Sequence, residues 1–177
     1  MGDKVFENPK DEEIIQRIIE FCGVYDGDIV MDFFSGSGTT AHSVMLASVN
    51  KNIEIRFILV QLPEEISVNK ATSEKSKKVA KAAIKLCDSL HKSHTICEIG
   101  KERIRRAGKR IKEENAGKEG IDKLDIGFRV LKLDSSNMQD VYYTPKEFTE
   151  NDLFADNVKP DRTAEDLLFQ VMLDLGV

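Results

Sequence analysis

The sequence has no tryptophan, only four prolines and three cysteines, and no long hydrophobic run. Without an apolar stretch of about 18 residues, it has no candidate transmembrane helix. Three cysteines, an odd number with no Cys-x-x-Cys pair, argue against a disulfide framework and favour reduced thiols. The first residues, Met1 to Lys4, lack the apolar core of a secretory signal. We therefore expect a cytoplasmic protein with no membrane partner.

The remaining composition is that of a folded protein with an uneven charge distribution. Of the 177 residues, 41% are hydrophobic and 32% are charged, which excludes a disordered chain. Residues 70–118 carry 15 basic and 6 acidic side chains, a net charge of +9, whereas the rest of the chain has a net charge of −14. This asymmetry indicates either an element that faces a polyanion or a solvated helix face.

Two short apolar runs flank a glycine-containing turn and a helical segment. Residues 29–34 (IVMDFF) and 55–60 (IRFILV) read as buried strands, and residues 39–49 read as a helix. Strand, turn, helix and strand within about 35 residues predict a βαβ unit. The two strands should therefore be parallel, joined by a right-handed crossover.

Apolar residues at three- and four-residue steps predict further helices over residues 11–21, 73–90, 98–114 and 163–175. Asp11 and Thr163 are suited to cap the first and last of these helices. The apolar face of the first helix consists of Ile14, Ile15, Ile18 and Ile19. Alternating residues predict one more strand over residues 126–133.

The turn between the first strand and its helix has the composition of a ligand site. Glycines allow the backbone to approach a ligand, and the N-terminus of the following helix favours a carboxylate or phosphate. A P-loop is excluded because no Gly-Lys follows. Gly36, Gly38 and Ala41 formally match the dinucleotide pattern Gly-x-Gly-x-x-Ala. Asp32, at the strand end, instead suits the ammonium group of S-adenosylmethionine. The third interpretation is a tight strand–helix turn with no ligand.

Residues 32–41 (DFFSGSGTTA) resemble motif I of the amino-methylating DNA methyltransferases. In particular, they resemble the modification subunit of type III restriction–modification systems. Residues 6–10 (FENPK) and the helix after them are similar to motif X, and residues 56–64 (RFILVQLPE) are similar to motif II of that branch. Further segments that look like the same branch are 95–107, 127–137 and 166–169.

This resemblance implies an α/β fold, a partial Rossmann-like S-adenosylmethionine-dependent methyltransferase fold with a mainly parallel sheet and flanking helices. It implies a cofactor-binding part over residues 1–134 and an acidic extension with a terminal helix over residues 135–177. The cofactor would be S-adenosyl-L-methionine. The residues expected to bind it are Asn8, Pro9, Lys10, Asp32, Phe33, Phe34, Ser35, Gly36, Ser37, Gly38, Thr39, Thr40, Gln61 and Glu64.

Two positions depart from the family pattern. Asp11 stands where motif X usually has a proline, and the neutral Gln61 stands where motif II is often acidic. Either Gln61 or Glu64 could accept hydrogen bonds from ribose hydroxyls, and we favour Gln61 for its position.

The catalytic signature of the family, Asp/Asn-Pro-Pro-Tyr/Phe, is absent because no two prolines are adjacent. We therefore expect no catalytic residue here and no methyl transfer by this chain alone. The resemblance implies a C-terminal piece of a longer, site-specific DNA adenine-N6 methyltransferase. Its implied partners are double-stranded DNA, a type III restriction subunit and, for the full-length protein, a second copy of itself.

Two other functions stay open at this point. One is a nicotinamide-dinucleotide-binding Rossmann domain. The other is a non-catalytic module that binds DNA or a protein partner and has a vestigial pocket. Binding of NADH instead of S-adenosylmethionine would favour the first, and salt-sensitive DNA binding without cofactor affinity would favour the second.

Two further patterns have both a structural and a functional interpretation. Cys87, His91, His94 and Cys97 superficially resemble zinc-ligand spacing, but Cys87 fits the buried face of a helix, so we predict thiols and no metal site. Seven cations lie within twelve residues and could either contact phosphates or pair with nearby glutamates. They are Lys101, Arg103, Arg105, Arg106, Lys109, Arg110 and Lys112.

Overall fold

The computed structural model describes residues 4–140 and 157–176. The chain divides into two compact units, Met1–Phe128 and Arg129–Val177, and each is described by itself. The functional division predicted after residue 134 stays a prediction.

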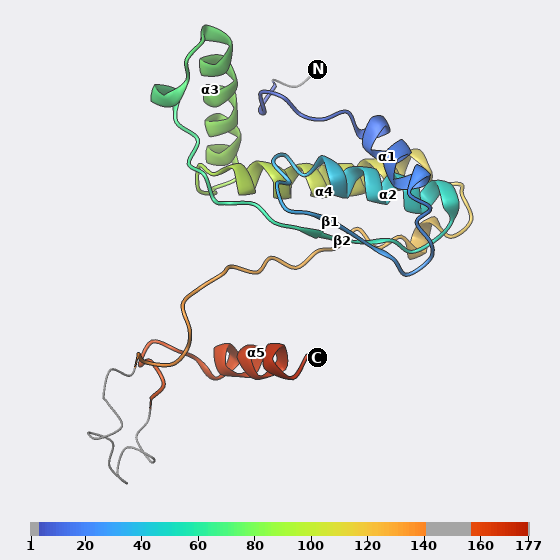
Figure 1. Ribbon diagram of the computed structural model, residues 1–177. Helices are drawn as coiled ribbons and strands as arrows, with labels where there is room; N and C mark the ends of the chain where they lie inside the picture. Colours follow the sequence, from blue (N-terminus) through green and yellow to red (C-terminus); the bar gives the residue numbers. More distant parts are fainter. Residues whose placement is uncertain (1–3, 141–156, 177) are drawn as a thin grey trace. The chain divides into compact units, whose positions relative to one another are not determined.

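The first unit is built on two parallel strands joined by a helix (Figure 1). Strand β1 (Ile29–Asp32) pairs with β2 (Arg56–Leu59), and helix α2 (Thr39–Lys51) connects them. Val30 lies opposite Phe57, and Asp32 lies opposite Leu59. The predicted strand–turn–helix–strand order and the parallel pairing are confirmed.

Helices cover one face of this small sheet. Helix α2 packs between α1 (Glu12–Phe21) and α4 (Ile96–Glu114), and Figure 1 shows α2 and α4 side by side over the strands. One core cluster joins α2 to α4 and the inner face of β2; it consists of Ala41, Met45, Ile104, Ala107 and Ile111, with Phe57 and Leu59 packed against it. The opposite face of the sheet, formed by Ile29, Met31, Ile58 and Val60, is exposed in the described part of the chain.

Helix α1 begins as predicted, and only part of its apolar face is buried. The Asp11 carboxylate caps it by accepting hydrogen bonds from the backbone N–H groups of Glu13 and Ile14. Ile19 is buried against α2, whereas Ile14 and Ile18 are 59% and 52% exposed. Helix α2 therefore covers only one side of the predicted isoleucine face.

Helix α3 (Glu74–Ser89) follows a short 3₁₀ turn (Val68–Lys70), and the Ser73 hydroxyl caps it. Its buried side faces the start of α4 and includes Cys87, which is fully buried with Ala83 and Ile99. Figure 1 shows α3 standing away from the sheet, at the end of the unit where α4 begins. Residues 91–95 interrupt the two helices, as the sequence predicts.

The strand predicted over residues 126–133 is wrong: these residues have no strand pairing in the structure. The chain leaves a second 3₁₀ turn (Ile121–Lys123) in an extended conformation. Leu124, Ile126 and Phe128 alternate inward and pack against the cluster between α2 and α4. This inward alternation ends at Phe128, because Val130, Leu131 and Leu133 are all exposed.

The second unit contains an isolated bridge between Met138 and Val158 and the helix α5 (Ala164–Leu175). Thr163 and Asp166 cap α5 reciprocally, which confirms the predicted cap at Thr163. Residues 141–156 of the predicted acidic extension lie outside the described residues. None of the helices in the described part of the chain is long and apolar enough to cross a membrane.

Candidate functional site

The glycine turn lies at the carboxyl end of β1, directly before α2. Gly36 and Gly38 have φ values of 51° and 74°, in the left-handed region that favours glycine. Gly38 is the N-cap of α2 and supplies no side-chain cap, so the positive end of the helix dipole opens onto this turn. The turn therefore combines a close backbone approach with a helix end that favours negative charge.

The Asp32 carboxylate organises this turn from the end of β1. Its Oδ1 accepts a hydrogen bond from the Phe34 backbone N–H at 3.0 Å, and its Oδ2 accepts one from the Thr40 hydroxyl at 2.6 Å. Asp32 thus connects the end of β1 to the first turn of α2. A carboxylate held by two donors at a strand end is an acceptor suited to a cationic amino group.

Gln61 comes to the same turn from the end of β2. Its side-chain Oε1 accepts a hydrogen bond from the Gly36 backbone N–H at 2.7 Å. The Gly38 N–H donates to the Ser35 carbonyl, also at 2.7 Å. Both glycine amides, which the sequence led us to expect on a ligand, are therefore engaged within the protein. Gln61 nevertheless lies at the turn, while the side chain of Glu64, the second choice, has no hydrogen bond there in the described structure.

The other predicted residues fall into an exposed set and a buried set. Phe33 and Phe34 are 61% and 91% exposed, so two aromatic rings stand in solvent beside the turn. Ser37 and Thr39 are buried, with hydroxyls 3.4 Å apart, and so point into the protein. Ser35 connects the strand ends because its N–H donates to the Val60 carbonyl.

The N-terminal segment passes over the turn. The Phe6 ring packs so closely on Gly36 that a Cβ at that glycine would lie 3.3 Å from the ring Cζ. Asn8, Pro9 and Lys10 follow this contact, and all three are exposed. The structure therefore brings the predicted motif X segment to the predicted motif I turn.

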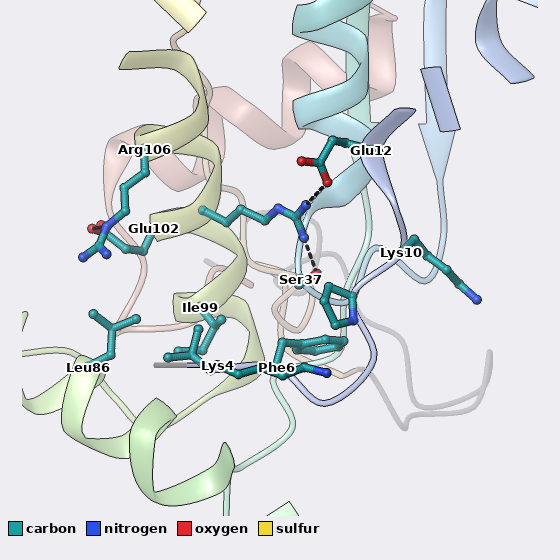
Figure 2. A pocket seen from close by; sticks show the side chains of 12 residues that line it. Lys4, Phe6, Lys10, Glu12, Ser37, Leu86, Ile99, Glu102 and Arg106 are labelled. Atoms are coloured by element: carbon teal, nitrogen blue, oxygen red, sulfur yellow. Dashed lines mark hydrogen bonds and ion pairs between the residues drawn. The ribbon is translucent and has the colours of Figure 1, made fainter. Parts of the chain in front are cut away.

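Arg103 of α4 is a residue at the turn that the sequence did not single out. Its Nη1 donates to the hydroxyls of Ser37 and Thr39 at 3.0 and 2.9 Å, and its Nη2 pairs with Glu12 at 3.3 Å. The dashed lines that reach Ser37 and Glu12 in Figure 2 are two of these contacts. In the sequence, Arg103 is one of seven cations of a basic helix. Only the fold shows that it, unlike the others, contacts the glycine turn.

Gly100 allows α4 to approach the turn this closely. A Cβ at Gly100 would lie 3.3 Å from the Gly36 carbonyl oxygen, and a Cβ at Gly38 would lie 3.3 Å from the Gly100 carbonyl oxygen. The first turns of α4 therefore support the glycine turn from behind. A glycine near the start of the predicted helix 98–114 is the signal that could have indicated this contact.

A cavity of about 370 Å³ lies next to this support. Among the residues that line it are Phe6, Pro9 and Lys10 of the N-terminal segment, together with Ser37 and Arg103. In Figure 2, Glu12 points toward the guanidinium group while Lys10 extends away from it. Of the predicted cofactor residues, only Pro9, Lys10 and Ser37 line this cavity, whereas Asp32 and Gln61 lie at the strand ends.

Burial changes the pKa of two groups behind the turn. Burial lowers the pKa of Arg103, and the neighbouring Glu12 partly opposes this change. Burial also lowers the pKa of His42 on α2, where Glu12 raises it and Arg103 lowers it further. The His42 Nδ1 is buried without a hydrogen-bond partner in the described structure.

The cysteines and histidines with zinc-like spacing have different surroundings in the structure. Cys87 is fully buried, as predicted, and burial raises the pKa of its thiol. The His94 ring pairs with Asp88 at 2.6 Å. Among the described residues, no group of three or more histidines, cysteines or acidic residues is placed to hold a metal ion.

Comparison with known families identifies the class. Residues 2–107, which include the glycine turn, its strands and most of the supporting helices, match the sequence model of the DNA methylase family of N6 and N4 methyltransferases. The chain belongs to this family. The matched region contains Asp32, Gln61 and Arg103, so the site described above lies within it.

The relatives narrow the class to one branch. The chain is 33% identical, over 138 residues, to the Mod subunit of the type III restriction-modification enzyme StyLTI of Salmonella typhimurium. It is 36% identical, over 128 residues, to the Mod subunit of EcoP15I of Escherichia coli. These alignments cover 78% and 72% of this chain, but only 18% and 15% of the relatives. The resemblance to type III modification subunits is confirmed, and the chain spans less than a fifth of each of these relatives.

Proposed function

We propose that this chain is the cofactor-binding part of a site-specific DNA adenine-N6 methyltransferase of a type III restriction–modification system. The observation that carries the proposal is the Asp32 carboxylate at the end of β1, beside a glycine turn that opens α2. Family membership and the similarity to Mod subunits support the same reaction class. The partial Rossmann-like fold is part of the proposal.

S-adenosylmethionine fits the chemistry of this turn. Its ammonium group would be accepted by Asp32, directly or through water, and its carboxylate would face the positive end of α2. Gln61 would accept hydrogen bonds from the ribose hydroxyls. Its hydrogen bond from the Gly36 N–H would be exchanged or shared when the ligand binds. The exposed Phe33 and Phe34 are available to cover the apolar parts of the ligand.

The cofactor supplies the methyl group, and this chain supplies its binding and orientation. The acceptor would be the exocyclic nitrogen of an adenine in duplex DNA. The groups that would contact that adenine belong to the Asp/Asn-Pro-Pro-Tyr/Phe signature, which this sequence lacks. A type III restriction subunit and a second modification subunit would complete the assembly.

Calorimetric titration of S-adenosylmethionine and its demethylated product tests the proposal, with NADH as the comparison ligand. Asp32→Asn keeps the shape of the side chain but removes its charge. We expect the wild-type chain to bind both adenosyl ligands and Asp32→Asn to bind them at least about tenfold more weakly, because a charge-assisted hydrogen bond contributes about 1.5–3 kcal/mol.

Asp28→Asn is the matched control. Asp28 lies at the opposite end of β1, where its carboxylate accepts a hydrogen bond from the Tyr25 N–H at 2.8 Å. This variant makes the same charge change directly before the same strand and should bind the adenosyl ligands like the wild type. Equal losses in both variants, or saturation by NADH alone, would contradict the proposal.

The absence of the catalytic signature predicts that this chain alone transfers no methyl group. The measurement is incorporation of labelled methyl groups into adenine-containing duplex DNA. Incorporation by the wild-type chain that Gly36→Val abolishes would show that the chain itself contains a complete active site.

A further inference from the structure

The basic region of the sequence divides into two helices with different charge environments. On α4, six of the seven cations between residues 101 and 112 pair with a carboxylate. Arg106 and Arg110, for example, bond to Glu102 and Glu114 one turn away, at 2.6 and 2.7 Å. The positive charge of α4 is therefore largely neutralised within the protein.

Helix α3 differs. Lys75, Lys78, Lys81 and Lys85 are all exposed, and none of them has an ion-pair partner within the described part of the chain. The helix contains only two acidic residues, and both are engaged: Glu74 pairs with Lys77, and Asp88 pairs with His94. Four positive charges on α3 thus have no compensating partner.

These four lysines form one stripe. Their steps of three and four residues place them on one side of α3, opposite the side that buries Ala83 and Cys87. From Lys75 to Lys85 the stripe covers ten residue steps, or about 15 Å along the helix axis. That length corresponds to between four and five base-pair rises of duplex DNA at about 3.4 Å each.

We propose that this lysine stripe, formed by Lys75, Lys78, Lys81 and Lys85, binds the phosphate backbone of double-stranded DNA. The choice of duplex DNA rests on the proposed function, whereas the stripe itself is defined by exposure and by the absence of ion pairs. Lysines on a helix contact phosphates as point charges and read no sequence, so the stripe would hold the duplex without selecting bases.

Fluorescence anisotropy with a short labelled DNA duplex, in a salt series between about 50 and 200 mM, tests the inference. Four phosphate contacts predict a slope of log K against log salt of about −3 to −4. The double variant Lys78→Gln/Lys81→Gln should bind several-fold more weakly and lower the magnitude of that slope by about two. Glutamine preserves the helix, and circular dichroism confirms that the variant is folded.

Lys109→Gln/Arg110→Gln is the matched control, because it removes two charges from exposed positions of α4 that pair with Glu113 and Glu114. It should leave the salt slope unchanged. Equal effects of the two double variants, no DNA binding by the wild type, or tighter binding of single-stranded RNA than of duplex DNA would each overturn the inference. Titration of S-adenosylmethionine into the same proteins reports on the proposed function separately, and both double variants should bind it normally.

Discussion

Arg103 illustrates how one side chain of a basic helix acquires a role of its own. Its guanidinium group joins α4 to the glycine turn and to α1, through Ser37, Thr39 and Glu12. The five donors of an arginine lie in a fixed plane, so lysine cannot reproduce the same set of bonds. Lys109 and Arg110, farther along α4, each make a single, exposed ion pair.

Replacing Arg103 by methionine should lower the free energy of unfolding by about 1–3 kcal/mol, because the buried hydroxyls of Ser37 and Thr39 and the carboxylate of Glu12 lose their donor. Lys109→Met, with the same loss of charge on the same helix, should change it by less than about 0.5 kcal/mol. Urea unfolding of the two variants measures both values. Similar small changes in both would contradict a role of Arg103 in supporting the turn.

The burial of His42 should make the free energy of unfolding depend on pH. Burial lowers the pKa of His42, so below its ordinary value of about 6.5 the unfolded chain binds the proton more readily than the folded chain. The free energy of unfolding should therefore fall as the pH decreases from about 6.5, and should be unaffected by His42 above it. The charged groups that act on this histidine are Glu12, Arg103, Arg110 and Glu114.

Urea unfolding between about pH 7.5 and 5.5 tests this prediction. His42→Gln should reduce the decline on the acid side. His91→Asn is the control, because His91 is exposed and has a φ of 53°, which asparagine tolerates. A decline that is identical in His42→Gln and in the wild type would show that other groups cause it.

At the scale of elements, glycines set how closely α4 approaches its neighbours. A Cβ at Gly108 would lie only 2.8 Å from the Ile126 Cβ, so the extended segment after residue 123 packs directly on the backbone of α4. Gly108 and Gly100 lie eight residues apart, about 80° from each other around the helix. One supports the packing of the extended segment, and the other supports the glycine turn.

Gly108→Ala should lower the free energy of unfolding by about 1 kcal/mol, because overpacking costs about 1–3 kcal/mol and exceeds the gain of about 1 kcal/mol in helix propensity. Gly117→Ala is the control, since no atom lies within 4 Å of a Cβ at that position. It should be neutral or slightly stabilising. Thermal unfolding of both variants measures the difference, and a stabilising Gly108→Ala would contradict the close packing.

At this scale the sequence predicts where helices start, but it does not predict which helix faces are covered by other elements. Asp11, Ser73 and Thr163 cap α1, α3 and α5 through local hydrogen bonds. Such caps depend on residues three positions apart and can therefore be inferred from sequence. The exposure of Ile14 and Ile18 depends on where α2 lies, which no local pattern specifies.

For the whole molecule, the buried core lies in the first unit. Every buried hydrophobic side chain of the described residues lies between Ile19 and Ile121. None of the residues of α5 is buried, and Leu173 and Leu175 are 77% and 74% exposed. The first unit therefore contains the packing that should determine cooperative unfolding.

A chain that ends at Phe128 should accordingly unfold cooperatively, with a midpoint close to that of the full chain. Residues 1–128 retain the packing of Leu124, Ile126 and Phe128 against the α2–α4 cluster. Urea unfolding followed by circular dichroism compares the two chains. A large drop in the midpoint would show that residues 129–177 stabilise the first unit.

The sequence by itself determined the features that depend on short separations. It determined the parallel strand pair with its connecting helix, the helix caps, the glycine turn beside Asp32 and the family to which the chain belongs. It also indicated the buried position of Cys87, because a helical period places that residue among apolar neighbours. These properties follow from backbone preferences and from the periods of helices and strands.

The tertiary structure alone decided the contacts between distant segments. Arg103 meets Ser37 across 66 positions of the chain, and Gln61 meets Gly36 across 25. Residues 126–133 alternate like a strand, but only Ile126 and Phe128 pack against the α2–α4 cluster, and none of these residues pairs with a neighbouring strand. A strand ladder needs a second backbone to pair with, whereas an alternating sequence does not. Likewise, the cations of α3 and α4 have the same appearance in sequence, and only their distances to carboxylates distinguish the unpaired lysine stripe from the neutralised helix.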